Sequence, residues 1–197
     1  MRSGCGSGAC LVGSVEQDIM RGLASGDQRS FARLVTLHGA RVQAIARQFL
    51  GNHADAEDVM QEVFVKAWRA STTFDPSRAS LSTWLYRITT NSCLDRLRRG
   101  KRWRWLGIEH IAEQADEALP SDEAIGQRQT VAAVRRDIRQ LPERQRLALL
   151  LVSVGECSAQ EVADVMNISK GGAEQLIVRA RQFLRQRQRE RDGHGQK

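Results

Sequence analysis

Residues 158–184, SAQEVADVMNISKGGAEQLIVRARQFL, decide the fold of this chain. Ser158, followed three residues later by Glu161, has the pattern of a capping box, which begins a helix. Asn167 tolerates the left-handed backbone that ends a helix, and Ser169 is suited to begin the next one. Apolar residues recur at helical spacing on both sides of this turn. The stretch therefore predicts a helix-turn-helix.

The rest of the chain repeats the helical spacing, with Gly and Pro confined to the junctions. Apolar residues recur every three or four positions in the segments 15–25, 30–51, 55–71, 82–99, 122–141 and 142–155. Gly51 is suited to end the second segment, and Pro142 is expected at the first helical position of the last one. Because no segment alternates convincingly with period two, the sequence predicts an all-α fold.

Charge divides the chain into blocks. The 30 Lys and Arg residues outnumber the 23 Asp and Glu residues, which gives a net charge of +7 and favours nucleic acid or an anionic membrane as a partner. Seven basic residues and one acid fall in 86–105, six acids and no base in 106–126, and eight bases and three acids in 170–197. The blocks predict two small helical domains, 15–105 and 123–190, joined by an acidic linker at 106–122, with a disordered extension at 1–14 and a tail at 191–197.

Aromatic and basic side chains are interleaved in residues 82–105, STWLYRITTNSCLDRLRRGKRWRW. Trp84 and Tyr86 can also be explained as core residues of a helix whose arginines face solvent, and for Trp84 this explanation is about as good as the functional one. Trp103 and Trp105 fit that explanation poorly, because they alternate with Lys and Arg and cannot all share one buried face. Stacking on a ring contributes about 1–3 kcal/mol per unpaired base, and nearby cations track the phosphates. The stretch therefore favours a surface that holds one strand of nucleic acid.

The segment 55–68 carries an acidic face opposite its apolar residues, formed by Asp55, Asp58, Gln61 and Glu62. Such a face is usually just solvated. In a chain this basic it cannot be the nucleic-acid surface, so we expect it to dock a protein partner.

Other features argue against several classes of protein. The sequence contains no Ser/His/Asp set, phosphate loop or paired catalytic carboxylates, so we expect no enzymatic activity, cofactor or metal. The longest apolar run, residues 147–152, is too short to span a bilayer, and the N-terminus lacks the pattern of a signal peptide. A cytoplasmic protein without membrane insertion is predicted. The four cysteines are too irregularly spaced for a disulfide framework.

In this order, the segments resemble the bacterial RNA polymerase sigma factors of the extracytoplasmic-function (ECF) group. The resemblance covers about residues 15–188 and rests on DAEDVMQEVFVKAW (55–68), FDPSRASLSTWLYRITTNSCLDRLRR (74–99) and LPERQRLALLLVSVGECSAQEVADVMNISKGGAEQLIVRAR (141–181). It implies a protein that binds core RNA polymerase and directs promoter recognition, DNA melting and transcription initiation. It also implies an anti-sigma factor that holds the protein inactive.

By motif position, the resemblance assigns residues to three surfaces. The clamp helices of the largest polymerase subunit would be bound by Asp55, Asp58, Gln61 and Glu62. The minus-ten promoter element would be opened and held by Trp84, Arg87, Asn91, Asp95, Arg98, Arg99, Lys101 and Arg102, with the loop from Phe74 to Ser80. The minus-thirty-five element would be read by Arg144, Lys170, Glu174, Gln175, Arg179 and Arg181, with Arg185 and Arg187 near phosphates. This second domain would also touch the flap of the second-largest subunit, and the linker would reach roughly 60 Å when fully extended.

Two departures from the family pattern limit the resemblance. Gly171, Gly172 and Glu174 stand where the recognition helix often begins with a basic and polar run, so the resemblance does not extend to sequence preference at the upstream element. Glu156 and Cys157 replace a more usual Gly-Leu pair; Cys157 is expected in the core, with redox sensing as an alternative. Two other functions stay open from the residues alone: a stand-alone helix-turn-helix transcriptional regulator that binds duplex DNA without polymerase, and a helical protein-interaction module.

Overall fold

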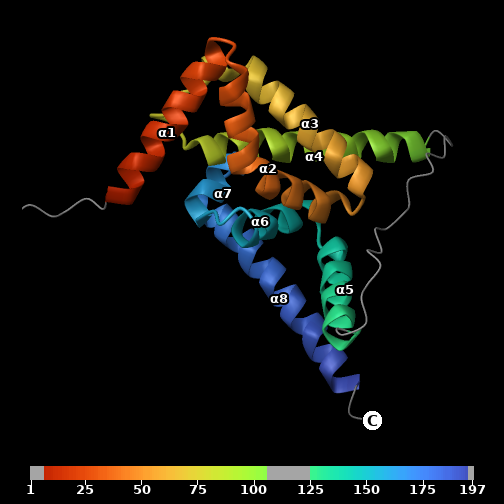
Figure 1. Ribbon diagram of the computed structural model, residues 1–197. Coiled ribbons are helices and arrows are strands. Elements are labelled where there is room, and N and C mark those ends of the chain that lie inside the picture. The colour runs from red at the N-terminus through yellow and green to blue at the C-terminus, as the bar shows by residue number, and fades with distance from the viewer. Residues whose placement is uncertain (1–6, 106–124, 195–197) are drawn as a thin grey trace, which may run out of the picture.

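The computed structural model describes residues 7–105 and 125–194. Within these ranges the chain forms eight α-helices and one short 3-10 turn, without a strand, which confirms the all-α prediction (Figure 1). In chain order the elements are α1 (Ser7–Ala24), α2 (Gln28–Leu50), α3 (His53–Arg69), η1 (Ser71–Thr73), α4 (Leu81–Trp105), α5 (Ile125–Gln140), α6 (Glu143–Ser153), α7 (Ala159–Met166) and α8 (Lys170–His194). None of the described helices is both long enough and apolar enough to cross a membrane.

The N-terminal half, α1–α4, is a bundle built on a helical hairpin of α2 and α3. Asp27 accepts hydrogen bonds from the backbone N–H groups of Arg29 and Ser30 and so begins α2, while Asn52 does the same for α3. Gly51 ends α2 in the left-handed conformation, at a φ of 76°, as its position in the sequence predicts. Helix α4 packs against both helices of the hairpin. The bundle core includes Leu34, Val42, Phe49, Val59, Val63, Leu81 and Leu85, all buried.

The C-terminal half, α5–α8, contains the predicted helix-turn-helix in α7 and α8. Ser158 and Glu161 form the expected capping box, and Asn167 ends α7 with a φ of 51°. The Ser169 hydroxyl accepts a hydrogen bond from the Gly172 N–H at 3.1 Å, which satisfies one donor at the start of α8. Local capping chemistry thus fixes both ends of the turn.

The two halves pack against each other along a continuous hydrophobic core. Helix α6 lies against α2, and α7 lies against α4 (Figure 1). The Arg146 guanidinium of α6 sits 4.5 Å from the centre of the Phe49 ring of α2, a cation–π contact across the boundary. Tyr86 of α4, only 1% exposed, lies beside Gly155 in the turn between α6 and α7. The described residues therefore form one packed body.

Three helix boundaries differ from the sequence predictions. Helix α1 begins at Ser7, inside the segment 1–14 that we expected to be disordered, and α4 continues to Trp105 beyond the predicted end near Arg99. Glycines lie inside both extensions, Gly8 and Gly13 in α1 and Gly100 in α4, and each costs a helix only about 1 kcal/mol relative to alanine. Pro142 is the N-cap of α6 and Glu143 its first residue, a shift of one position from the prediction.

Candidate polymerase- and DNA-binding surfaces

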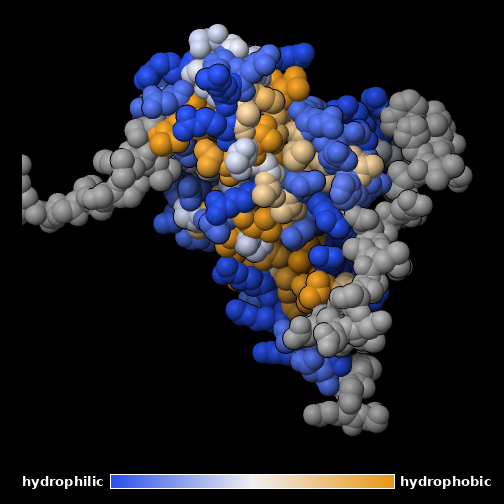
Figure 2. Space-filling model, viewed as in Figure 1, coloured by the Kyte–Doolittle hydropathy of each residue, from blue (hydrophilic) through white to orange (hydrophobic). Residues whose placement is uncertain are grey.

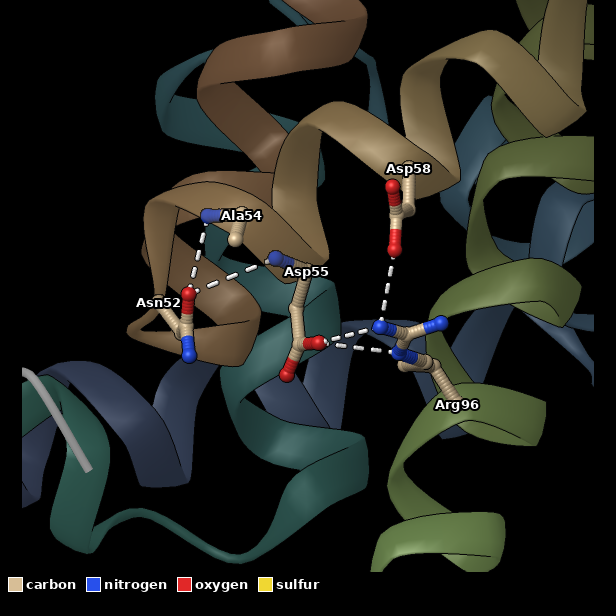
Figure 3. A network of polar contacts seen from close by, with 5 residues as sticks. All are labelled: Asn52, Ala54, Asp55, Asp58 and Arg96. Carbon is tan, nitrogen blue, oxygen red and sulfur yellow. Dashed lines mark hydrogen bonds and ion pairs between the residues drawn. The ribbon is translucent and has the colours of Figure 1, made fainter. Parts of the chain in front are cut away.

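The acidic face of α3 is braced by Arg96, a residue of α4 (Figure 3). The Arg96 Nη2 atom lies 2.5 Å from Asp55 Oδ1 and 2.9 Å from Asp58 Oδ2, while its Nε donates to Asp55 Oδ1 at 2.9 Å. Partial burial opposes the charged form of Arg96, but the two carboxylates outweigh it and raise its pKa. Sequence reasoning assigned Asp55 and Asp58 to a partner and missed Arg96, because its partners lie far away along the chain.

The other two members of the α3 face are placed differently. Gln61 is exposed, and Glu62 forms an ion pair with Lys66 at 2.6 Å. Lys66 also donates to the Ser92 hydroxyl of α4 at 3.0 Å. The predicted set therefore lies on one helix face, as expected, but only Gln61 and the outer parts of Asp58 and Glu62 are readily available to a partner.

The predicted minus-ten residues form a stripe along α4. Trp84, Arg87, Asn91, Asp95, Arg98 and Arg102 follow one another at intervals of three or four positions, which places them on one helix face, with Arg99 and Lys101 beside it. Arg87, Asn91 and the cations from Arg98 to Arg102 are exposed, and Trp84 is half-buried. The Trp84 ring packs on Phe74 of the preceding loop at 5.4 Å between ring centres. Trp103 and Trp105 belong to α4, but their side chains lie outside the described residues.

Two cations of the α4 surface contact the C-terminal half. Arg87 Nη2 donates to the Asp164 carbonyl oxygen of α7 at 2.7 Å. Lys101 Nζ lies 2.5 Å from Glu143 Oε1 of α6. Within α4 itself, Arg98 lies 3.6 Å from Asp95. The predicted DNA-binding cations are thus brought together as expected, and part of the group is engaged inside the protein.

The predicted minus-thirty-five residues are exposed. Lys170, Glu174, Gln175, Arg179 and Arg181 all lie on the outer side of α8, and Arg144 is exposed on α6. Hydrophilic residues line the outer edge of α8 in Figure 2, while hydrophobic residues gather in the middle of the view, where the two halves meet. The exposed face of α8 is the geometry that a recognition helix needs in order to enter a major groove.

The C-terminal part of α8 is anchored to α5. Asp137 of α5 is only 3% exposed and contacts both Arg187, at 3.4 Å, and Arg191. Arg187 also pairs with Glu190 at 3.0 Å. Arg187, which we expected near phosphates, therefore also neutralises a buried carboxylate, and its contact with DNA stays a prediction.

The turn between α6 and α7 contains the Glu156-Cys157 pair that departs from the family pattern. The N–H groups of Gly155 and Cys157 donate to the carbonyl oxygens of Leu150 and Leu151 at 3.2 and 3.0 Å, which forces Glu156 into the left-handed region at a φ of 56°. A residue other than glycine costs about 1–2 kcal/mol there. The Glu156 carboxylate reaches Arg41 of α2, with 2.6 Å between Arg41 Nη2 and Glu156 Oε2.

Cys93 and Cys157, the cysteines whose side chains the structure describes, are buried and free. Burial raises the pKa of the Cys93 thiol and of the Cys157 thiol to about 12. Since the thiolate is the reactive form, neither thiol suits redox sensing in this arrangement. Cys157, 7% exposed, is a core residue, as predicted.

Comparison with known proteins identifies the class to which this two-part arrangement belongs. Residues 34–104 match the family model "Sigma-70 region 2", and residues 132–184 match "Sigma-70, region 4". The ECF RNA polymerase sigma factor SigW of Bacillus subtilis is 33% identical over 174 residues, covering 84% of this chain and 92% of SigW. The RNA polymerase sigma factor CnrH of Cupriavidus metallidurans is 32% identical over 169 residues, covering 82% and 87%. The chain belongs to the ECF sigma factor family, and the alternative of a stand-alone regulator is set aside.

Solved structures agree with this assignment. CnrH in complex with the cytosolic domain of CnrY has a TM-score of 0.66 and 30% sequence identity, covering 86% of this chain and 94% of that one. The sigma factor RpoE from Bartonella quintana, in complex with the anti-sigma factor NepR, has a TM-score of 0.67. At 22% identity and with coverage of 82% of this chain and 98% of that one, RpoE supports the fold alone. The ECF resemblance and the two-part helical fold are thereby confirmed.

Proposed function

We propose that this sigma factor docks on the clamp helices of the largest polymerase subunit through α3. Helix α4 opens and holds the minus-ten element. Helix α8 reads the minus-thirty-five element. The C-terminal half also touches the flap of the second-largest subunit. The protein is a transcription initiation factor rather than an enzyme and acts in the cytoplasm, where polymerase and promoter DNA are found. An anti-sigma factor controls it, as the membership of the ECF family implies; the structure of CnrH, 30% identical, was solved in complex with the cytosolic domain of CnrY.

The observation that carries this proposal is the stripe along α4. A ring, Trp84, stands at one end beside Phe74, and exposed cations stand at the other, so bases stack at one end while phosphates are held at the other. Unstacking a base from a duplex costs a few kcal/mol. Because stacking returns about 1–3 kcal/mol per base, two captured bases offset the cost of local melting.

The docking surface is tested on Gln61 and Glu62. Asp58 is less suitable, because its bond to Arg96 makes any loss ambiguous between docking and the packing of α3 on α4. Gln61 is exposed, and Glu62 pairs with Lys66 of its own helix rather than with a residue of α4. We expect the double variant Gln61→Lys/Glu62→Gln to bind core polymerase roughly tenfold or more weakly, the size of an interface hot spot, with an unchanged urea midpoint.

The matched control is Asp18→Asn, which removes an exposed carboxylate paired with Arg21 on α1. Its polymerase affinity and its run-off transcription from a cognate promoter should equal those of the parent chain. Equal polymerase binding by Gln61→Lys/Glu62→Gln would refute the docking surface. Permanganate footprinting tests the α4 part independently: without reactive thymines in the complex of polymerase, this chain and promoter, the strand-holding role fails.

A further inference from the structure

A cavity of about 270 Å³ lies between α2 and α5, where the C-terminal ends of the two helices meet (Figure 1). None of the described residues that line it belongs to the surfaces proposed for polymerase or promoter. On the α2 side, Ala40 and Ala44 are too short to fill the space between the helices, and Gln43 and Gln48 supply amide groups. Pockets that bind small molecules begin at about 300 Å³, so a ligand of this cavity would be small.

The cavity is positively charged. Arg47 of α2 and Arg135 and Arg139 of α5 line it, and among the described residues no Asp or Glu lines it with them. Arg135 and Arg139 are exposed, and within residues 7–105 and 125–194 neither of these two guanidinium groups forms an ion pair. Each helix C-terminus carries roughly half a unit of negative charge. The two helix ends therefore cannot balance even Arg135 and Arg139 alone.

Gly51 leaves room for Arg139 beside this cavity. This glycine ends α2 at a φ of 76°, and a Cβ atom on it would lie 3.3 Å from Arg139 Cδ and 3.6 Å from Arg139 Nη1. The side chain of Arg139 thus lies across the end of α2, in space that any other residue at position 51 would crowd. The left-handed turn that the sequence predicts at Gly51 also serves to seat a cation from the other half of the molecule.

We propose that this cavity binds a small organic diphosphate, of the class of the nucleoside diphosphates. Arg135 and Arg139 are four positions apart, so their side chains start about 5–6 Å apart on one face of α5, a spacing suited to two neighbouring phosphate groups. A guanidinium binds phosphate oxygens with two parallel hydrogen bonds. The apolar surface of Ala40, Ala44 and Ile138 accommodates the uncharged part of the ligand. This site is additional to the proposed function and does not depend on it.

Titration calorimetry of the full chain tests the ligand class with three probes: ADP, inorganic pyrophosphate and adenosine. We expect ADP to bind with a Kd below about 1 mM, pyrophosphate to bind more weakly, and adenosine to give no signal at the same concentrations. Pyrophosphate binding as tight as that of ADP would overturn the organic class, because the apolar wall would then contribute nothing. Absence of binding by both anions, or equal binding by adenosine, would overturn the site.

Two double variants with the same change in net charge separate the cavity from the general basicity of the chain. Arg135→Gln/Arg139→Gln removes two lining guanidinium groups, and we expect it to bind ADP tenfold or more weakly. Arg33→Gln/Arg136→Gln is the matched control, because both arginines are exposed, lie on the same two helices and do not line the cavity. At physiological salt it should bind ADP within about twofold of the parent chain, since charges beyond about 8 Å are screened. Equal weakening in both variants would overturn the site.

Filling the cavity without a change in charge is the independent test. Ala44→Leu places a larger side chain among the lining residues, and we expect it to weaken ADP binding tenfold or more. Ala32→Leu, at an exposed position of the same helix, should leave binding unchanged, and the urea midpoint shows whether either variant is destabilised. ADP binding that survives Ala44→Leu would place the anion on the outer surface and overturn the cavity.

Duplex DNA is the other polyanion that exposed arginines could hold. A short duplex oligodeoxynucleotide should bind Arg135→Gln/Arg139→Gln and Arg33→Gln/Arg136→Gln equally well, because a cavity between two helices does not admit a duplex backbone. If duplex affinity falls in Arg135→Gln/Arg139→Gln by as much as ADP affinity, these arginines contact DNA, and the small-molecule site is overturned.

Discussion

Helices α4 and α8 have the same length, 25 residues, and both carry many arginines, yet the protein uses them differently. Helix α4 lies between the two halves, with Tyr86 and Cys93 buried and with Arg87, Arg96 and Lys101 bonded to other helices. The first turns of α8 face solvent, and among the described residues no ion pair is formed by Arg179 or Arg181. Two helices of similar composition therefore differ in how far their basic side chains are exposed to a binding partner.

The difference lies in which side chains solvent reaches. The proposed recognition residues of α8 are exposed, whereas the Arg87 guanidinium of α4 is bonded to the Asp164 carbonyl oxygen of α7. Measuring the free energy of unfolding of variants in α4 and α8, and its dependence on pH, tests this difference.

The largest effect is expected from removing the ring of Tyr86. This side chain is 1% exposed, and aromatic-to-alanine changes in a core typically cost about 3–5 kcal/mol. Leu184 on α8 is only half-buried, so Leu184→Ala should cost about 1–2 kcal/mol. Urea unfolding of both variants measures the difference, with Tyr86→Phe as the control that keeps the ring. Equal losses at Tyr86 and Leu184 would contradict the unequal burial of α4 and α8.

A smaller effect is expected at the anchor of α8. Asp137→Asn keeps the shape of the side chain but removes the charge that binds Arg187 and Arg191, and hydrogen bonds to a charged group contribute about 2 kcal/mol. The free energy of unfolding should fall by about that amount. Asp192→Asn, at an exposed position of the same helix, is the control and should change it by less than about 0.5 kcal/mol. A loss at Asp137 no larger than at Asp192 would mean that α8 is not held by this cluster.

The sequence alone predicted hydrogen bonds between residues a few positions apart, but not ion pairs between residues far apart in the chain. The capping box of Ser158 and Glu161 and the left-handed Asn167 follow from residues within a few positions of each other, and both predictions are confirmed. The pairing of Arg96 with Asp55 spans 41 positions, and that of Arg41 with Glu156 spans 115. Such contacts depend on how helices cross, which spacing along one helix does not specify.

The same limit applies to the candidate site. The outward placement of the recognition residues on α8 could be expected from helical periodicity, which determines which residues share a face, whereas the residues of the α4 stripe came from the family resemblance. That α7 covers part of the stripe depends on the packing of one half on the other. The roles of the stripe, of the α3 face and of the recognition residues in binding polymerase and promoter stay predictions until the variants are measured.

The smallest effect concerns pH and separates the two halves through His38. This residue of α2 is 6% exposed and its Nε2 atom is buried without a hydrogen-bond partner among the described residues. Burial, reinforced by the positive charge of Arg41, lowers the pKa of His38. The folded state therefore binds this proton less readily than the unfolded state, in which the pKa of histidine is about 6.5. Stability from His38 is present above that pH and is lost as the pH falls below it.

We expect unfolding at pH 5.5 to require about 1 kcal/mol less than at pH 7.5 on account of His38, and His38→Gln to flatten this dependence. His53→Gln, at an exposed position on α3, should leave it unchanged. Because no histidine lies between residues 125 and 193, the loss should begin in the N-terminal half, where amide hydrogen exchange would show faster opening of α2 before α8. Earlier exchange in α8 would place the acid-sensitive group elsewhere and remove this distinction between the halves.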